Sequence, residues 1–267
     1  MLWDTHMHSH FSGDSEADPA AMAAAAKTAG LSGICFTEHL DYDYPGDPEL
    51  FLLDADNYMD AIRTLSAVYP KDFSILTGLE LGLQPHLSER HKMLLEKYDF
   101  DFIIGSSHVV HGMDPYYPEY YVNKTEEVAY REYFSSILEN ITVFDGFDVY
   151  GHLDYVVRYG PNKNKYYSYT TYQDIIDEIL KALIARGKGI EVNTGGFRNE
   201  LGHPNPTEDI IRRYRELGGE IITLGSDAHA PEHVAYAFDK IPDLLREAVF
   251  QYFTVFEKRR PRFLPLP

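Results

Sequence analysis

Three histidines stand at alternate positions near the start of the chain, in the stretch MLWDTHMHSH: His6, His8 and His10. Residues two apart in a β-strand point to the same face, so this spacing would place imidazole rings side by side. Imidazole nitrogens are common ligands of divalent transition-metal ions. A polar edge strand or a solvated terminal segment would show the same spacing, so the rest of the chain has to decide between these alternatives and a metal site.

Metal-capable or polar side chains also occur near the carboxyl ends of other β-type runs. Seven such runs are found at residues 2–8, 33–39, 73–83, 101–108, 147–154, 187–195 and 219–229. Their side chains of interest are His6 and His8, Glu38 and His39, Glu80, His108, His152 and Asp154, Glu191 and Asn193, and Asp227 and His229. Buried imidazoles and carboxylates cost free energy unless they are paired or coordinated. Their recurrence in every run therefore predicts one shared metal site.

Helical stretches separate these runs. Asp18 as N-cap and Pro19 at the first helical position begin an alanine-rich helix that ends at Gly30, and further helices are expected near 54–69, 86–98, 125–140, 172–186 and 207–217. Alternating βα units predict parallel strands with helices packed outside. Seven units favour a TIM-like α/β barrel, formed by residues 1–267 as a single domain, with the active site at the carboxyl ends of the strands. A doubly wound open sheet is the alternative, and the tail at 252–267 could hold one more strand.

The composition excludes several classes of protein. The 267 residues are 44% hydrophobic, which is enough for a sizeable core and argues against disorder. A formal net charge of −18 disfavours a nucleic-acid partner, although bound cations could still attract a small anionic substrate. No stretch reads as a membrane span or a signal peptide, so a cytoplasmic location is expected. Cys35, the single cysteine, is expected to be a small buried hydrophobe.

Six motifs in this order, DTHMHSH, FTEH, GLELG, GSSH, GHLD and GSDAH, resemble the PHP (polymerase and histidinol phosphatase) superfamily of metal-dependent phosphoesterases over about residues 4–229. Within it, SHFSGDSE, ICFTEH, GHLDYVVRYG and EVNTGGFR are most similar to the stand-alone histidinol-phosphate phosphatases. The resemblance implies a distorted seven-stranded (βα) barrel, three divalent metal ions (zinc, manganese or iron) and nine ligands, namely His6, His8, Asp14, His39, Glu80, His108, His152, Asp227 and His229. His10 lies outside this set and is expected at the surface or behind a ligand.

The resemblance also implies how the ligands are shared. His6, His8, Glu80 and Asp227 would surround one ion, Glu80 would bridge to a second ion held by His108 and His152, and Asp14, His39 and His229 would hold the third. Many relatives have a histidine at the position of Asp14. A carboxylate is a harder ligand that favours Mn²⁺ or Fe²⁺ over Zn²⁺, so the identity of the metal stays open.

The reaction that the resemblance implies is hydrolysis of L-histidinol phosphate to L-histidinol and phosphate, in histidine biosynthesis, by attack of a metal-bound hydroxide. Glu80, Asp227 and His229 are the expected catalytic residues. No serine or cysteine nucleophile motif is found, in agreement with this mechanism.

Candidate substrate contacts come from loops that follow the strands. Arg158 and Arg198 are expected to bind the phosphate, with surface arginines as the alternative. The remaining candidates are Glu191 and Asn193 as acceptors for the leaving group, Tyr117 as part of the pocket wall, and His111 and His233 as substrate contacts or exposed loop histidines. Asp154 is expected to orient a ligand histidine, and His86, His91 and His203 are expected at the surface.

Two other functions remain open at this point. The first is a PHP enzyme acting on a nucleotide, a sugar phosphate or phosphotyrosine, which would differ in the leaving-group pocket and hence in the stretch EVNTGGFR. The second is a non-catalytic metal-binding or polymerase-associated module. The acidic chain, the lack of a polymerase region and the intact ligand set disfavour that module. The oligomeric state is left open.

Overall fold

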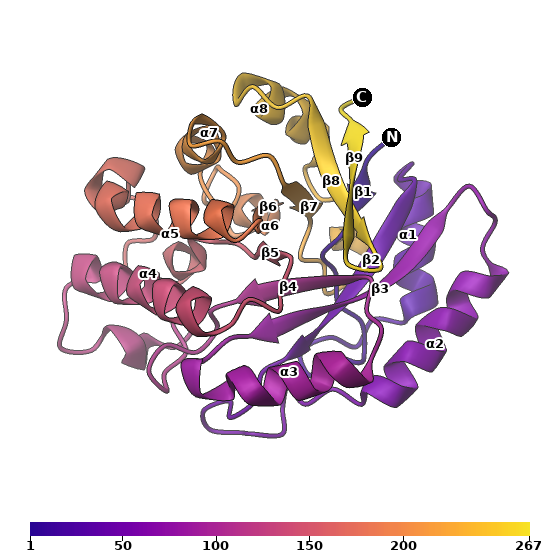
Figure 1. Ribbon diagram of the computed structural model, residues 1–267, viewed down its shortest axis with the longest axis horizontal. Coiled ribbons are helices and arrows are strands. Elements are labelled where there is room, and N and C mark those ends of the chain that lie inside the picture. The colour runs from indigo at the N-terminus through magenta and orange to yellow at the C-terminus, as the bar shows by residue number, and fades with distance from the viewer.

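Seven short parallel strands form the centre of the structure, and they neighbour one another in chain order (Figure 1). The computed structural model describes residues 1–267. The strands are β1 (Trp3–Asp4), β2 (Gly33–Leu40), β3 (Ser74–Gly82), β4 (Phe102–Ser106), β5 (Val149–Tyr150), β6 (Gly189–Asn193) and β7 (Ile222–Gly225). All eight residues of β2 are buried, as expected for a strand covered on both faces.

The seven-stranded sheet closes on itself into a barrel. The backbone N–H of Thr5 donates to the carbonyl of Leu224 (2.8 Å), and that of Asp227 donates to the carbonyl of His6 (2.9 Å). Met7 and Ala228 form a parallel bridge between these segments. The predicted barrel is therefore confirmed and the alternative of an open sheet is wrong. The first predicted strand is shorter than expected, because regular pairing of β1 with β2 ends at Asp4.

Helices surround the barrel (Figure 1). They are α1 (Pro19–Thr28), α2 (Ala55–Val68), α3 (Ser88–Lys97), α4 (Glu126–Val143), α5 (Gln173–Ala185), α6 (Gly195–Arg198), α7 (Glu208–Glu216) and α8 (Ile241–Glu247). Short 3₁₀ turns occur at η1 (Pro85–Leu87), η2 (Pro118–Tyr121), η3 (Tyr155–Arg158), η4 (Tyr169–Tyr172), η5 (Pro231–His233) and η6 (Phe238–Lys240). No helix combines the length and the apolar character that a membrane crossing requires.

Local sequence signals explain where these helices begin and how they pack. Asp18 caps α1 through a hydrogen bond from the backbone N–H of Ala20 (2.6 Å), and Pro19 is the first helical residue, as predicted. In α5 the buried residues Ile176, Ile179, Leu180 and Leu183 recur at helical spacing. Burying each such side chain contributes roughly 1.5–3 kcal/mol to folding. One apolar stripe per helix is thus enough to hold it against the barrel.

The C-terminal tail forms two strands, where the sequence predicted at most one. β8 (Tyr252–Glu257) and β9 (Arg260–Pro265) pair as an antiparallel hairpin whose turn residues, Lys258 and Arg259, both have positive φ. Pro261 and Pro265 do not exclude β9, because an edge strand can do without their missing N–H groups. The ring of Phe256 stacks on Phe102, at the start of β4, so the hairpin covers the amino-terminal end of the barrel. The opposite end is left for the site.

Candidate metal centre and active-site cavity

The alternate histidines after β1 face a glutamate from β3. Parallel pairing of β2 with β3 places His39 opposite Glu80, and all these residues lie at the carboxyl ends of their strands. The Nε2 atoms of His6 and His8 are 3.1 Å apart. Oε2 of Glu80 lies 3.2 Å from Nε2 of His6 and 3.5 Å from Nε2 of His8. Oδ1 of Asp227 lies 3.8 and 3.5 Å from the same two nitrogens. The four groups predicted for the first ion therefore converge on one point.

The second carboxylate oxygen of Glu80 faces another pair of histidines. Oε1 is 2.8 Å from Nε2 of His152 and 3.2 Å from Nε2 of His108. Glu80 is completely buried, and its two oxygens thus address two different groups of ligands. This is the arrangement that the predicted bridging role requires.

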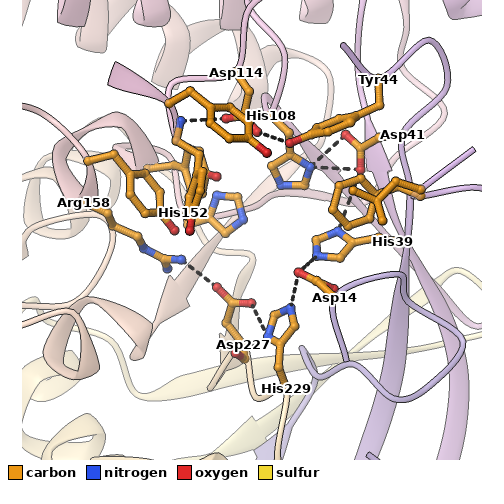
Figure 2. A pocket seen from close by; sticks show the side chains of 16 residues that line it. Asp14, His39, Asp41, Tyr44, His108, Asp114, His152, Arg158, Asp227 and His229 are labelled. Carbon is orange, nitrogen blue, oxygen red and sulfur yellow. Dashed lines mark hydrogen bonds and ion pairs between the residues drawn. The ribbon is translucent and has the colours of Figure 1, made fainter. Parts of the chain in front are cut away.

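A third group lies toward the open side of the site (Figure 2). Oδ2 of Asp14 is 3.2 Å from Nε2 of His229 and 3.6 Å from Nε2 of His39. The ring of His8 stacks between the rings of His39 and His229, at centroid distances of 4.1 and 4.2 Å. All nine side chains that the resemblance implied as ligands therefore lie in one continuous cluster.

Hydrogen bonds on the outer side of the cluster set the tautomers of its histidines. Nδ1 of His6 donates to Oε1 of Glu191 (2.6 Å), Nδ1 of His108 donates to Oδ1 of Asp41 (2.9 Å), and Nδ1 of His229 donates to the backbone carbonyl of Asp227 (3.0 Å). A neutral imidazole that carries its proton on Nδ1 presents a lone pair on Nε2. In the neutral state that metal binding requires, the Nε2 lone pairs of these three histidines therefore point into the cluster.

The cluster fits divalent metal ions on the evidence of its own atoms. Oε2 of Glu80 and Nδ1 of His39 are buried 3.1 Å from each other, yet no hydrogen bond of normal geometry joins them, although buried polar atoms are normally paired. Lone pairs that face one another without an intervening proton repel unless a cation lies between them. A set of imidazole nitrogens and carboxylate oxygens suits zinc, manganese or iron.

The carboxylates of the site are held in the ionised state that metal binding needs. Burial alone would raise the pKa of Asp227, but Arg158 and His6 hold it well below its usual value. Burial opposes ionisation of Glu80 in the same way, and His6, His108 and His39 hold its pKa well below its usual value. Burial also lowers the pKa of His39, but Asp14 and Glu80 outweigh it and raise this pKa to about 9 without metal. Metal binding at His39 would therefore displace a proton.

A cavity of about 300 Å³ opens above the cluster (Figure 2). Its wall is mostly aromatic, with Tyr44, Phe51, Tyr116, Tyr117, Tyr155 and Tyr159 beside Leu50, and its polar groups include Asp14, Asp41, Asp114 and Arg158. Of the substrate contacts expected from the sequence, only Arg158 and Tyr117 line this cavity.

Arg158 lies at the edge of the cavity and is 5% exposed. Its Nη1 donates to Oδ2 of Asp227 (2.7 Å), Nη2 to Oδ1 of Asn193 (2.8 Å) and Nε to Oδ1 of Asn205 (2.8 Å). A guanidinium has five N–H groups, so two remain that these bonds do not use. The alternative that Arg158 is a surface arginine is therefore wrong.

Arg198 does not reach the cavity. Its Nη1 and Nη2 donate to the backbone carbonyls of Ser226 (3.2 Å) and Asp227 (2.8 Å). Asp227 has a positive φ of 55°, which is uncommon for a residue other than glycine. Arg198 thus supports the unusual turn that presents Asp227.

Glu191 and Asn193, which were predicted to contact the leaving group, are buried and do not line the cavity. Glu191 accepts hydrogen bonds from Nδ1 of His6 (2.6 Å) and from the backbone N–H of His152 (2.9 Å). Asn193 accepts from Arg158 and from the backbone N–H of Gly195 (2.9 Å). Through these hydrogen bonds, both side chains orient residues in and around the histidine–carboxylate cluster.

Several other expectations need correction. His111 is half-exposed and bonds to Glu132 and Glu139 on α4, and neither His111 nor His233 lines the cavity. Their predicted contact with the substrate is not supported. Asp154 accepts from Asn205 (2.6 Å), Tyr167 (3.2 Å) and the backbone of Thr207 (3.1 Å), and not from a ligand histidine.

The predicted surface histidines divide as well. His10 and His86 are exposed and His203 is partly buried, whereas His91 is completely buried on α3. Cys35 is buried, as expected.

The sequence analysis missed Asp41 and Asp114 and, among the aromatic residues of the cavity wall, Tyr44, Phe51, Tyr155 and Tyr159. Asp41 follows β2 and orients His108, while Asp114 accepts from the hydroxyl of Tyr44 (2.6 Å) and the backbone N–H of Tyr116 (2.7 Å). Asp41 lies two residues after the FTEH motif, and this position was the one available signal. Asp114 lies in a tyrosine-rich loop without any local pattern that marks it.

Comparison with known proteins agrees with the site. The PHP domain family model matches residues 4–195. Histidinol-phosphatase of Lactococcus lactis is 35% identical over 95% of this chain and 93% of its own length, and a probable histidinol-phosphatase of Clostridium acetobutylicum is 32% identical over 89% and 90%. The crystal structure of the Lactococcus lactis histidinol phosphate phosphatase, complexed with zinc, L-histidinol and phosphate, superimposes with a TM-score of 0.92 at 34% identity and covers 98% of both chains.

The barrel and its histidine–carboxylate cluster are those of a PHP-type metal-dependent phosphoesterase. The chain belongs to the PHP family, and within it to the histidinol-phosphatases. The family prediction made from the six motifs is thus confirmed.

Proposed function

We propose that the protein hydrolyses L-histidinol phosphate to L-histidinol and phosphate, a step of histidine biosynthesis. The observation that carries this proposal is the likeness to the Lactococcus lactis phosphatase, whose structure holds zinc, L-histidinol and phosphate and matches almost the whole chain. The aromatic cavity above the histidine–carboxylate cluster is of a suitable size for a small phosphate ester.

The nine clustered side chains would hold three divalent ions in the grouping described above. When bound, such ions activate water as a nucleophile at neutral pH and neutralise charge on the phosphoryl oxygens. Glu80 would be a ligand of the first and the second ion, Asp227 a ligand of the first, and His229 a ligand of the third. These three residues are therefore the ones whose loss should disturb the reaction most directly.

Arg158 is the protein cation best placed for the phosphate. It lines the cavity, its remaining two N–H groups are not used by Asp227, Asn193 or Asn205, and it stays charged at every relevant pH. We assign it to a phosphoryl oxygen, while the same side chain keeps Asp227 in place.

The leaving group would lie against the aromatic wall. L-Histidinol carries an ammonium group and an imidazole ring, which need an anionic acceptor and a flat surface. Asp114 supplies a carboxylate in the cavity wall, and Tyr117 and Tyr159 supply rings beside it. These loop residues replace Glu191 and Asn193 as the proposed determinants of specificity.

The test is the initial rate of hydrolysis of L-histidinol phosphate by the Zn²⁺- and Mn²⁺-loaded enzyme, next to a panel of nucleotide, sugar and aromatic phosphomonoesters. We expect kcat/KM for L-histidinol phosphate to exceed the panel about a hundredfold, or about 3 kcal/mol of transition-state preference. Asp227→Asn should abolish the activity, and Asp60→Asn on the exposed face of α2 is the matched control. Equal, slow rates over the whole panel would contradict the proposed substrate.

A further inference from the structure

Glu38 is a buried carboxylate that the proposed reaction does not use. It precedes His39 on β2 and is completely buried. Its oxygens accept hydrogen bonds from the hydroxyl of Ser9 (2.6 Å), the backbone N–H of Ser9 (2.9 Å) and the hydroxyl of Ser12 (2.6 Å). All three donors are neutral and come from the loop that carries His8. The carboxylate therefore holds this loop against β2.

Ser12 connects Glu38 to the metal cluster. A serine hydroxyl has one hydrogen to donate and two lone pairs to accept with. The hydrogen goes to Glu38, and one lone pair accepts from the backbone N–H of His39 (3.0 Å). The other lone pair faces Nδ1 of His8 at 3.1 Å. With the single hydroxyl hydrogen already committed, the proton of this last hydrogen bond has to belong to His8.

The commitment of this hydrogen matters because a serine hydroxyl could otherwise either donate to Nδ1 of His8 or accept from it. The outer partners of His6, His108 and His229 are two carboxylates and a backbone carbonyl, none of which has a proton to give when the carboxylates are ionised. The outer partner of His8 is a hydroxyl, which could donate to Nδ1 and leave the proton on Nε2. In that tautomer Nε2, which faces Glu80 and Asp227 at 3.5 Å, would have no lone pair for a metal ion. Because the hydroxyl of Ser12 donates its hydrogen to Glu38, it cannot donate to Nδ1 of His8, and this second tautomer is excluded.

We propose that Glu38 and Ser12 are positioning residues that fix His8 in the Nδ1–H tautomer and so set the affinity of the metal position to which His8 belongs. The inference rests on the metal centre of the proposed function and deepens it. Neither residue lines the cavity, so neither touches the substrate.

Two measurements test this inference without relying on turnover. The first is the tautomer of His8 in the metal-free wild-type protein, read from long-range ¹H–¹⁵N correlations of ¹⁵N-histidine-labelled protein. We expect a protonated Nδ1 and an unprotonated Nε2. The second is stepwise titration of the metal-free protein with Zn²⁺ against a chromophoric chelator. Ser12→Ala should weaken one binding step ten- to hundredfold, as is typical when an outer partner of a ligand is removed.

Two further variants separate positioning from general loss of structure. Ser12→Thr keeps the hydroxyl and should restore both the tautomer and the affinity. Ser9→Ala removes another hydrogen bond to the same carboxylate without touching a histidine, and it should bind Zn²⁺ like the wild type. A wild-type His8 that carries its proton on Nε2, or Ser12→Ala protein with unchanged Zn²⁺ affinity, would overturn the inference and leave the proposed function intact. Wild-type protein that binds no Zn²⁺ would contradict both.

Discussion

Arg158 holds a buried carboxylate and faces the cavity with the same guanidinium group. Replacing it with alanine would leave Asp227 without its cation and Asn193 and Asn205 without their shared donor. Breaking a buried pair from one side typically costs about 3–5 kcal/mol. We therefore expect Arg158→Ala to lower kcat/KM for the phosphate ester at least a hundredfold and to lower the free energy of unfolding measured with urea.

Two further substitutions resolve the roles of this side chain. Arg158→Lys retains the charge but cannot make three planar hydrogen bonds, so it should recover only part of the activity. Arg198→Ala is the comparison, because Arg198 bonds two backbone carbonyls and does not line the cavity. It should reduce kcat/KM less than Arg158→Ala. An Arg158→Ala enzyme with wild-type kcat/KM would refute the proposed contact with the phosphate.

The residues that the sequence could identify are those whose signal is local. His6, His8, His39, Glu80 and His108 lie in or directly after β-type runs, where strand geometry decides which way they point. Glu191 and Asn193 carry the same signal but point below the cavity, because an inward-facing residue can either reach a substrate or support the residue above it. The depth of the residue in the barrel decides between contact with a substrate and support of another residue. The spacing of residues along a strand does not indicate this depth.

At the scale of single elements, helix α3 carries a histidine that is buried without a partner. His91 is completely buried, both of its ring nitrogens lack a hydrogen bond, and its ring packs between Tyr42 and Phe144. Burial lowers the pKa of His91 from 6.5 to about 4. Because the unfolded chain takes up the proton at higher pH than the folded one, stability is lost as the pH falls from about 6.5 through about 4. The loss amounts to roughly 3 kcal/mol.

We expect His91→Leu to remove this part of the acid sensitivity. The free energy of unfolding, measured with urea at several pH values, should fall less steeply below pH 6.5 in the variant than in the wild type. His10→Leu, at an exposed position, is the control and should keep the wild-type slope. Identical slopes for His91→Leu and the wild type would show that His91 does not carry this effect.

His91 also shows why the exposure of single residues on a helix was harder to predict than the helix itself. Helices at 55–68, 126–143 and 173–185 were predicted within three residues of their observed ends, because the capping residues Asp54 and Thr125 mark the first two and an apolar stripe marks the third. His91 lies on a helix whose apolar stripe is weak, and nothing near it in the sequence indicates that Tyr42 and Phe144 cover it. Contacts between distant loops and helices decide such cases, as they do for Asp41 and Asp114 in the cavity.

At the scale of the whole molecule, the histidine–carboxylate cluster joins the segment after β1 to residues on or after β2, β3, β4, β5 and β7. Its nine side chains come from segments between residues 6 and 229, and the barrel closes where the backbone of His6 meets that of Asp227. A ligand that binds only the folded state stabilises it by about 2.7 kcal/mol at a hundredfold excess over its dissociation constant. Bound ions should therefore act as a cross-link of the closed barrel.

We accordingly expect that removing metal with a chelator lowers Tm by several degrees and that added Zn²⁺ restores it. For a chain of this size, about 1 kcal/mol corresponds to roughly 2–4 °C. Glu80→Ala removes the carboxylate that faces both histidine pairs, so its Tm should respond much less to chelator or Zn²⁺. Glu89→Ala, at an exposed position on α3, is the matched control, and its Tm should respond to chelator and Zn²⁺ as the wild-type Tm does. An identical wild-type Tm with and without chelator, after verified metal loading, would show that bound metal does not stabilise the closed barrel. The cluster would then contribute to the reaction but not to stability.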